Sequence, residues 1–394
     1  MTNLLTRSPL LVIVLAQLFG TSLWFSINGV WLSFSRDLGF GETELGWMTL
    51  AVQAGFISGT LALAITGLAD RFGASRIFAL ASLLGALVNA GFILVADFLP
   101  ASLLLRFLTG LCLAGIYPLG MKMVIAWTPK YAGAALAWLV GMLTLGTALP
   151  HLMRGATLGM PWQWPLLGAS MLALVGGLLI WLLGDGPHLP KRAGSMMLTQ
   201  GLAALRVTRF RAVAGGYIGH MWELYAFWML VPLLVGRELE RLGHSDQIIP
   251  WLAFAIIATG SIGCVLGGFL SRRLGSAWVA RRALTTSGLV CLGYPLLSGA
   301  PSLILLVLLF VWGLAVIADS PQFSALAAAN APPELVGSSL SVMNAVGFGV
   351  TLPAIWLTSS LWAEQSVWVV AWLLPGPVLG LMAFRKLGPD APPA

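Results

Sequence analysis

The chain has 394 residues, of which 58% are hydrophobic and only 9% are charged. Soluble domains carry about 25% charged residues, and the 35 charged side chains present here are too few to cover the outside of a water-soluble fold of this length. This composition argues against cytosolic enzymes, nucleic-acid-binding proteins and secreted scaffolds, and it points to a protein that spans a lipid bilayer.

Twelve apolar runs follow one another along the chain, each bounded by charged residues, Gly or Pro. They cover residues 8–33, 44–66, 77–96, 101–124, 133–152, 163–184, 211–235, 250–270, 283–299, 302–324, 336–361 and 366–384. Most reach the roughly 20 residues that cross a bilayer as a helix, and a backbone in lipid has to satisfy its own hydrogen bonds. The shortest run, 283–299, is expected to form a tight helical hairpin with the next. No cleavable signal peptide is visible, so the first run is predicted to be a membrane span.

Lysine and arginine are distributed unevenly between alternate loops. If the N-terminus is cytoplasmic, the outer face holds four basic residues, Arg36, Arg154, Arg237 and Arg241, and the inner face holds sixteen. Because cytoplasmic loops carry the excess of Lys and Arg, both termini are predicted to be cytoplasmic. The net charge of +7 is therefore a topology signal, and no nucleic-acid partner is needed to explain it.

The sequence carries no signature of an enzyme, an ATP-driven pump or a disulfide framework. Its three cysteines, Cys112, Cys264 and Cys291, lie in apolar runs without a CxxC pair, so we interpret them as small hydrophobic residues. No Walker loop suggests ATP as an energy source, and no Ser/His/Asp or HExxH arrangement suggests an enzyme. We expect no enzymatic activity, no bound metal and no cofactor.

The two halves of the chain resemble each other at a nearly constant offset. Residues 110–118 match 313–321 and residues 146–150 match 349–353 at an offset of 203, while 70–73 lines up with 272–275 at 202. The repeat predicts two six-helix bundles in parallel topology, residues 1–184 and 211–394, joined by a basic cytoplasmic linker over 185–210.

The loop after the second run carries a family signature. It reads Gly67-Leu68-Ala69-Asp70-Arg71-Phe72-Gly73-Ala74-Ser75-Arg76 and is similar to the G-x-L-A-D-R-x-G-R-K loop of the major facilitator superfamily, although Thr66 stands at the first glycine and Ala74-Ser75 replace the basic pair. Arg106 and Gly110 resemble the family's R-x-x-x-G element. The resemblance covers essentially the whole chain. It implies an all-α integral membrane fold of twelve transmembrane helices in two six-helix bundles, which rock about a central site to give alternating access.

The resemblance also implies a cytoplasmic gate, with Asp70 and Arg71 latching the outward-open state. Asp319, toward the inner end of the tenth run, is expected either to meet Lys122, Lys130 or Arg71 at this gate or to cap a helix that is broken at Pro321.

Two acid–base residues lie within the seventh run. An ionisable side chain in lipid costs at least about 2.5 kcal/mol at a helix centre, so it is a functional hypothesis by default. Glu223 lies about halfway along this run, and His220 precedes it by three residues, on the same face of a helix. We predict that Glu223 and His220 carry a proton; the alternative is a buried pair that only holds two helices together. A metal site is a lesser alternative because further ligands are missing.

Arg106 lies about six residues into the fourth run. A permanent charge at this depth has to face a cavity, a carboxylate or backbone carbonyls. We predict that Arg106 binds an anionic solute or acts on a proton-carrying acid. The alternative is that it snorkels to the outer interface, since six helical residues span only about 9 Å.

The resemblance further implies that spans one, four, seven and ten line the central cavity. Their polar and aromatic candidates for solute binding, besides Arg106, are Gln17, Trp24, Asn28, Thr109, Tyr117, Tyr225, Trp228 and Trp312. Gln17, Trp24 and Asn28 are spaced by seven and four residues and are expected to share one face of the first span.

Together these features predict a monomeric secondary active transporter of the bacterial inner membrane. It would move a small solute, with a weak preference for an anion or zwitterion, by alternating access coupled to protons; its partners would be the solute, protons and membrane lipid. Two alternatives remain: a proton-driven exporter of drugs or siderophore-like molecules, and a non-transporting receptor or assembly factor with the same fold.

Overall fold

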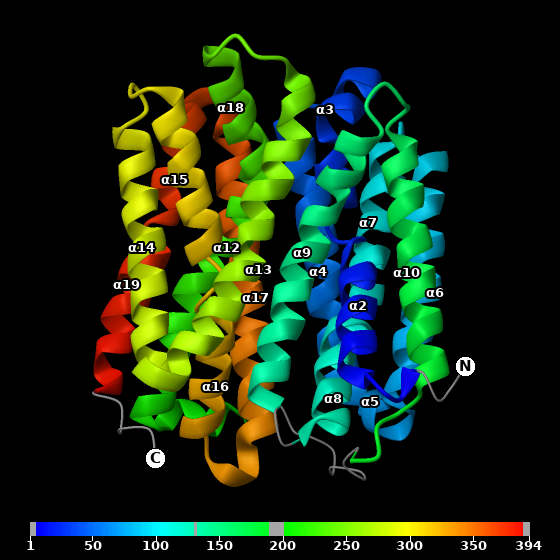
Figure 1. The fold of residues 1–394 in the computed structure, drawn as a ribbon, viewed down its shortest axis with the longest axis vertical. Coiled ribbons are helices and arrows are strands. Elements are labelled where there is room, and N and C mark those ends of the chain that lie inside the picture. Colours follow the sequence, from blue (N-terminus) through cyan, green and yellow to red (C-terminus); the bar gives the residue numbers. More distant parts are fainter. Residues whose placement is uncertain (1–4, 130–131, 189–200, 389–394) are drawn as a thin grey trace. The chain divides into compact units, whose positions relative to one another are not determined.

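The computed structural model describes residues 5–129, 132–188 and 201–388, and these ranges are helical without any strand (Figure 1). The chain divides into two compact units, Met1–Ser195 and Met196–Ala394, which are treated separately below as unit 1 and unit 2. The predicted boundaries of the two bundles remain a prediction, because residues 189–200 of the expected linker lie outside the described residues.

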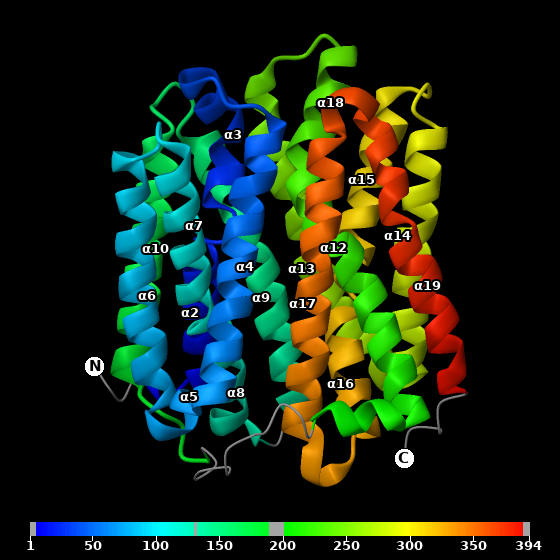
Figure 2. The same cartoon turned by 180° about the vertical axis from the view of Figure 1, so that it is seen from behind.

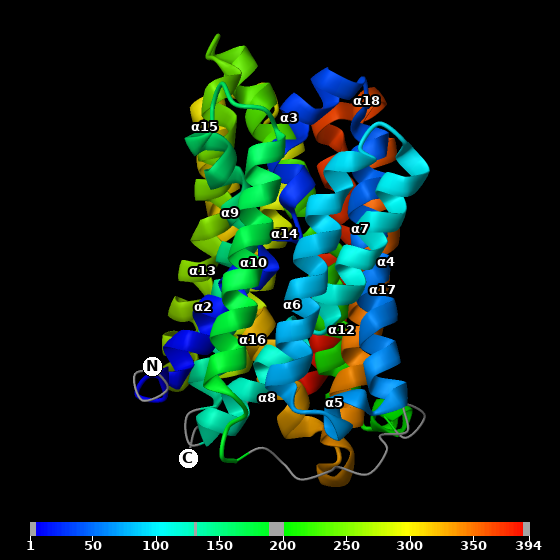
Figure 3. The ribbon, with the colours of Figure 1, turned by 90° about the vertical axis from the view of Figure 1, so that its right-hand side faces the viewer.

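Unit 1 contains nine α-helices in its described residues, and the longer ones run along one another (Figure 3). They are α2 (Pro9–Thr21), α3 (Ser26–Leu38), α4 (Glu42–Thr66), α5 (Leu68–Arg71), α6 (Ala74–Gly91), α7 (Leu99–Ala114), α8 (Tyr117–Trp127), α9 (Ala132–Ala156) and α10 (Gln163–Leu183). Helix α4 packs along α7, and α10 packs along α6 and α2.

Unit 2 is built around its longest helix, α12, against which α17 and α19 pack (Figure 2). Its α-helices are α12 (Thr208–Arg241), α13 (Ile249–Leu274), α14 (Ser276–Leu296), α15 (Ser302–Ala315), α16 (Ser320–Asn330), α17 (Val336–Ser360), α18 (Trp362–Gln365) and α19 (Pro375–Phe384). Short 3₁₀ turns extend several of these helices, the longest being Ser366–Leu373 before α19.

Eleven helical segments of the described chain are long and apolar enough to cross a membrane. They confirm the predicted runs, with one exception: the ninth run, 283–299, falls in α14, which is not among the eleven. Helix α14 carries Arg281 and Arg282 in its first two turns, and these charges interrupt its apolar length. A count of twelve spans therefore remains a prediction.

The first, fourth and tenth spans are each broken into two α-helices. The fourth span breaks between α7 and α8, and the tenth between α15 and α16. Pro118 and Pro321 lie in the first turn of the second helix in each case, where proline's missing N–H and fixed φ are tolerated. The first span breaks at residues 22–25 without any proline. This break is stabilised by side chains of other helices, above all Arg106.

The internal repeat is visible as a repeated helix contact. A Cβ atom at Gly110 of α7 would fall on the carbonyl group of Val52 in α4, and a Cβ atom at Gly313 of α15 would fall on the carbonyl group of Ile256 in α13. Because lipid provides no hydrophobic drive between helices, close approach through small residues stabilises the pair. The two glycines matched by the repeat thus each allow two helices of their own unit to pack closely.

Candidate functional site

Arg106 of α7 is buried in unit 1, and its amino groups bind the break in the first span. Nη2 lies 2.6 Å from the carbonyl oxygen of Trp24 and 3.4 Å from that of Leu23. Nη1 donates to the hydroxyl of Ser26 at 3.1 Å and to Oδ1 of Asn89 at 3.3 Å. The side chain is 1% exposed, so these groups replace its hydration.

The break provides the negative partial charge that a buried guanidinium needs. The last carbonyl groups of a helix have no partner within the helix, and the C-terminal end of α2 is the negative end of its dipole. No carboxylate pairs with Arg106 among the described residues. Backbone carbonyls were one of the three environments expected for this charge, and the structure places Arg106 there.

Asn89 of α6 connects Arg106 to helix α10. Its Oδ1 accepts from Ser26 at 2.7 Å, and its Nδ2 donates to the hydroxyl of Ser170 and the carbonyl of Leu166, both in the region of α10, at 3.0 and 3.1 Å. One cation therefore organises α2, α3, α6, α7 and α10. Its predicted contact with solute remains a prediction, and Nε has no hydrogen-bond partner in the described structure.

The break also separates the polar residues expected on one face of the first span. Trp24 donates to Gln53 of α4 at 3.2 Å, and Asn28 donates to Thr49 of α4 at 3.0 Å. Gln17, in contrast, lies on α2 at the level of Gly120 in α8, and both polar atoms of its buried amide lack a hydrogen-bond partner among the described residues.

The two other unit 1 candidates lie on the fourth span. Thr109 donates to the carbonyl of Leu105 within α7, and the ring of Tyr117 lies 6.5 Å from that of Phe56, between centroids.

Unit 2 buries three acid–base side chains at one place. Glu223 and His220 project from α12, and Asp319 stands between α15 and α16. Nδ1 of His220 lies 2.9 Å from Oδ1 of Asp319, and all three side chains are at most 1% exposed. The structure thus brings the two predicted proton carriers together with a residue that was expected at the gate.

Polar groups of modest strength surround the carboxylate of Glu223. The thiol of Cys291 in α14 donates to Oε2 at 3.6 Å, and Ser287 and Trp312 also face this carboxylate. In the described part of the chain no lysine or arginine pairs with Glu223 or Asp319. The positive end of α16, which begins directly after Asp319, is a favourable neighbour for a negative charge.

Aromatic rings enclose this cluster. Tyr217 and Phe323 lie 5.9 and 6.2 Å from the ring of His220, between centroids. The ring of Trp312 lies 4.4 Å from that of Phe227, between centroids, with the two planes tilted by 35°. One turn along α12, Tyr225 and Trp228 form an edge contact at 5.1 Å.

The predicted cytoplasmic gate is described only in part. Asp70 and Arg71 belong to α5. Arg71 is exposed, while the side chain of Asp70 lies outside the description. The roles of both, and of Asp319 as a gate residue, remain predictions.

Two carboxylates that were not expected from the sequence have defined contacts in the structure. Asp185 accepts from the backbone N–H of Ser75 at 2.8 Å, at the N-terminus of α6, where the signature sequence ends. No local pattern marks this contact, because 110 residues separate the partners.

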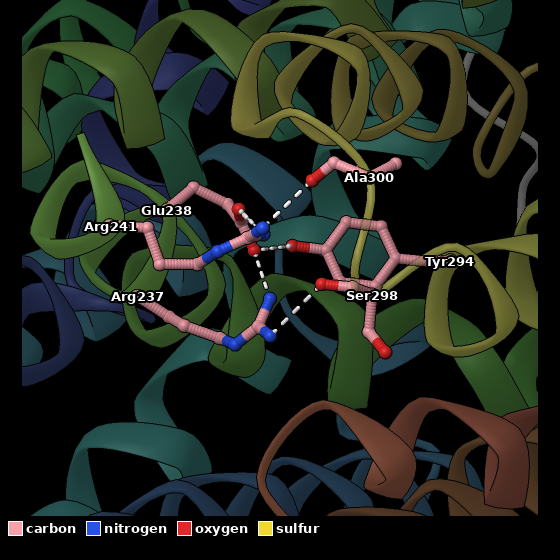
Figure 4. A network of polar contacts seen from close by, with 6 residues as sticks. All are labelled: Arg237, Glu238, Arg241, Tyr294, Ser298 and Ala300. Carbon is pink, nitrogen blue, oxygen red and sulfur yellow. Dashed lines mark hydrogen bonds and ion pairs between the residues drawn. The ribbon is translucent and has the colours of Figure 1, made fainter.

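The second missed residue, Glu238, is fully buried at the end of α12 (Figure 4). Arg241 donates to its Oε2 at 2.8 Å, Tyr294 donates to its Oε1 at 3.3 Å, and Arg237 also pairs with it. The same arginines donate to the carbonyls of Ser298 and Ala300. This group, the Glu238 clamp, attaches α12 to the turn between α14 and α15. The sequence signal for it was an acid with basic residues one position before and three positions after.

Comparison with known proteins gives one family and several solved structures of the same fold. A family model described as Major Facilitator Superfamily matches residues 11–355. No curated protein matches the chain by sequence. Among solved structures, the xylose transporter XylE from E. coli, in a partially occluded inward-open conformation, is 15% identical with a TM-score of 0.76 over 98% of each chain.

Two other solved structures share the fold at similar identity. A variant of the nucleoside transporter NupG is 15% identical with a TM-score of 0.70, over 96% of this chain and 99% of that one. A bacterial homologue of the human lysosomal transporter Spinster is 16% identical with a TM-score of 0.64, over 97% and 94%. At these identities the likeness shows the fold alone.

Proposed function

Because the chain belongs to the major facilitator superfamily, we propose that it is a secondary active transporter that moves a small solute by alternating access and couples this movement to protons. The observation that carries proton coupling is the buried cluster of Glu223, His220 and Asp319. Two carboxylates and one imidazole share this cluster with no lysine or arginine paired to them in the described residues.

Such a cluster has to respond to protons. An unpaired carboxylate in a low-dielectric interior is expensive, so protonation of Glu223 removes a large cost and deprotonation restores it. A change of this size is enough to bias two conformations of a transporter, since a ligand shifts an equilibrium by its difference in affinity for the two states. Glu223 is the proposed proton carrier and His220 its partner.

The proposed membrane arrangement follows the distribution of charge. The protein would lie in the bacterial inner membrane as a monomer with twelve spans and both termini in the cytoplasm, because basic residues favour that side. Asp70 and Arg71 would form part of the cytoplasmic gate.

The proposed solute is small and polar, with an anion or zwitterion favoured. Arg106 and His220 support this preference, although both side chains also have partners within the protein. The solute would contact polar and aromatic side chains of the first, fourth, seventh and tenth spans, the candidates being Gln17, Trp24, Asn28, Thr109, Tyr117, Tyr225, Trp228 and Trp312. Structures of the same fold include proteins described as a proton:xylose symporter and a nucleoside transporter, so sugars and nucleosides belong in the test panel.

The experiment has two steps. A thermal-shift screen of the purified protein with sugars, nucleosides, carboxylates and amino acids finds a ligand, because binding to the folded state raises the apparent stability. Proteoliposomes that contain a pH-sensitive dye then receive that ligand. We expect it to move protons in the wild type, and we expect Glu223→Gln to abolish proton movement while solute exchange across the membrane continues.

Other outcomes identify the alternatives. Solute and protons moving in opposite directions would identify an exporter, for which drugs and siderophore-like molecules form a second panel. Solute movement at wild-type rate without any proton movement would overturn the proton-coupling proposal. Ligand binding without flux under any gradient would favour a receptor or assembly factor.

A further inference from the structure

Asp319 reaches His220 from a different part of unit 2. His220 projects from the continuous helix α12, whereas Asp319 stands at the break of the tenth span, directly before Ser320, the first residue of α16. The distance from Nδ1 to Oδ1 is 2.9 Å, and the side chains are 0% and 1% exposed. The contact therefore fixes the imidazole ring away from solvent.

The chemistry of this contact determines which ring nitrogen carries the proton. An ionised carboxylate can only accept hydrogen bonds, so its short contact with Nδ1 favours a proton on Nδ1. Neither ring nitrogen has a hydrogen bond of good geometry among the described residues, so the 2.9 Å ion-pair contact with Oδ1 is what distinguishes Nδ1 from Nε2. Which nitrogen is protonated is set by the partner of the other one, and Nε2 is then the atom that exchanges protons.

Few other titratable groups face this ring. Glu223 lies one turn further along α12, Tyr217 lies 5.9 Å away between ring centroids, and Cys291 of α14 contacts Glu223. Helices α15, α16, α17 and α19 contain no titratable side chain. Helix α13 contributes Cys264, whose thiol donates to the carbonyl of Ile317.

We infer that Asp319 is the positioning residue of the proton site: it holds His220 with a proton on Nδ1 and leaves Nε2 to exchange a proton with Glu223. The exchange step rests on the proposed function. In that step the O–H bond of the protonated Glu223 carboxyl breaks and an N–H bond forms at Nε2. Glu223 becomes a carboxylate, His220 becomes an imidazolium, Asp319 stays ionised, and the summed charge of the three groups does not change.

Solid-state NMR of the full chain in lipid bilayers tests this inference without any solute. The chain has four histidines, so labelling histidine with ¹⁵N gives few signals, and His220→Gln assigns the signal of interest. Ring nitrogens with and without a proton differ widely in chemical shift. For the wild type we expect the proton of the neutral His220 ring to lie on Nδ1.

Two substitutions separate the acceptor from the charge. Asp319→Ala removes both, and we expect the neutral ring to change to the Nε2–H form that free histidine prefers. Asp319→Asn keeps an acceptor oxygen in the same shape. We expect the proton to stay on Nδ1, while the population of the doubly protonated ring, which needs the negative charge, falls about tenfold.

A matched control for these substitutions lies in the same helix as His220. Glu240→Gln changes an exposed acid of α12 and should leave the His220 signals unchanged. A wild-type proton on Nε2 with a bare Nδ1, or an unchanged His220 spectrum in Asp319→Asn, would overturn the inference. If the spectra agree but the proteoliposomes move no protons with solute, the positioning role stands and the proposed function fails.

Discussion

Unit 1 and unit 2 each bury charge, but they stabilise it in opposite ways. In unit 1 the guanidinium of Arg106 is bound by backbone carbonyls and neutral side chains where the first span is broken. In unit 2 the carboxyl groups of Glu223 and Asp319 share their surroundings with an imidazole, a thiol and an indole, while the seventh span, α12, continues past them.

The difference follows from the chemistry of the two charges. Arginine does not lose its proton in proteins, so a buried arginine needs fixed acceptors, and a helix break supplies them at the level of the backbone. A buried carboxyl group, in contrast, can become neutral by taking up a proton and then needs no cation beside it. The cation is therefore suited to a permanent structural role and the acids to a reversible one, and four substitutions test this distinction through stability.

The largest expected effect is that of Arg106→Met. The carbonyls of Leu23 and Trp24 would lose a charged donor inside the protein, and we expect the free energy of unfolding to fall by about 4 kcal/mol. Thermal unfolding of the purified protein in detergent measures the loss, with the exposed Arg76→Met as a control that should unfold like the wild type. Normal stability combined with lost solute binding would instead assign Arg106 to the solute.

Glu238→Gln should have the next largest effect. Removing the charge from the Glu238 clamp leaves two arginines without their acid, at a cost of about 2 to 3 kcal/mol; this is below the usual loss for a buried pair because both arginines reach solvent. Chemical unfolding of the wild type and variant under identical detergent conditions provides the comparison. If Glu238 behaved like an unpaired buried acid, the variant would be as stable as the wild type.

Asp185→Ala should have a smaller effect. Its carboxylate caps α6 through the N–H of Ser75, and loss of an N-terminal cap costs about 1 kcal/mol. Amide hydrogen exchange in the first turn of α6 should accelerate while the rest of unit 1 keeps its protection. Asp97→Ala, in the loop before α7, is the control. Equal exchange in both variants would show that Asp185 does not stabilise the helix end.

The smallest effect on stability is expected for Glu223→Gln. This acid has no lysine or arginine partner among the described residues, so its replacement by a neutral amide of the same shape should change the free energy of unfolding by less than about 1 kcal/mol. Differential scanning fluorimetry of Glu223→Gln beside Glu238→Gln makes the contrast direct. A loss as large as that of Glu238→Gln would mean that Glu223 holds helices together.

Much of the fold could be predicted from apolar length and from proline. The runs ended where charges, Gly or Pro interrupted them, and eleven of them correspond to membrane-length helices. The breaks before Pro118 and Pro321 also have a local signal. The break at residues 22–25 has none, because the donors that stabilise it come from Arg106, more than 80 residues later in the chain.

The site was predictable to the extent that its residues are neighbours on one helix. Glu223 and His220 share a face by spacing alone, and in the structure both side chains are buried beside Asp319. The contact between His220 and Asp319 depends on how α12 packs against the broken tenth span, which no spacing encodes. For the same reason the Glu238 clamp was missed, since Tyr294, Ser298 and Ala300 come from another hairpin.

Pro232 lies within α12 between the acid cluster and the Glu238 clamp. Proline removes one backbone hydrogen bond from a helix and favours bending there. The half of α12 before Pro232 and the half after it are therefore joined where the helix bends most easily. The half of α12 after Pro232 is attached to the turn between α14 and α15 through the Glu238 clamp, and the half before Pro232 carries His220 and Glu223. A displacement of the half before Pro232 would therefore change the bend angle of α12 at Pro232. Two spin labels, one on each side of Pro232, would report this bend as a change in the distance between them.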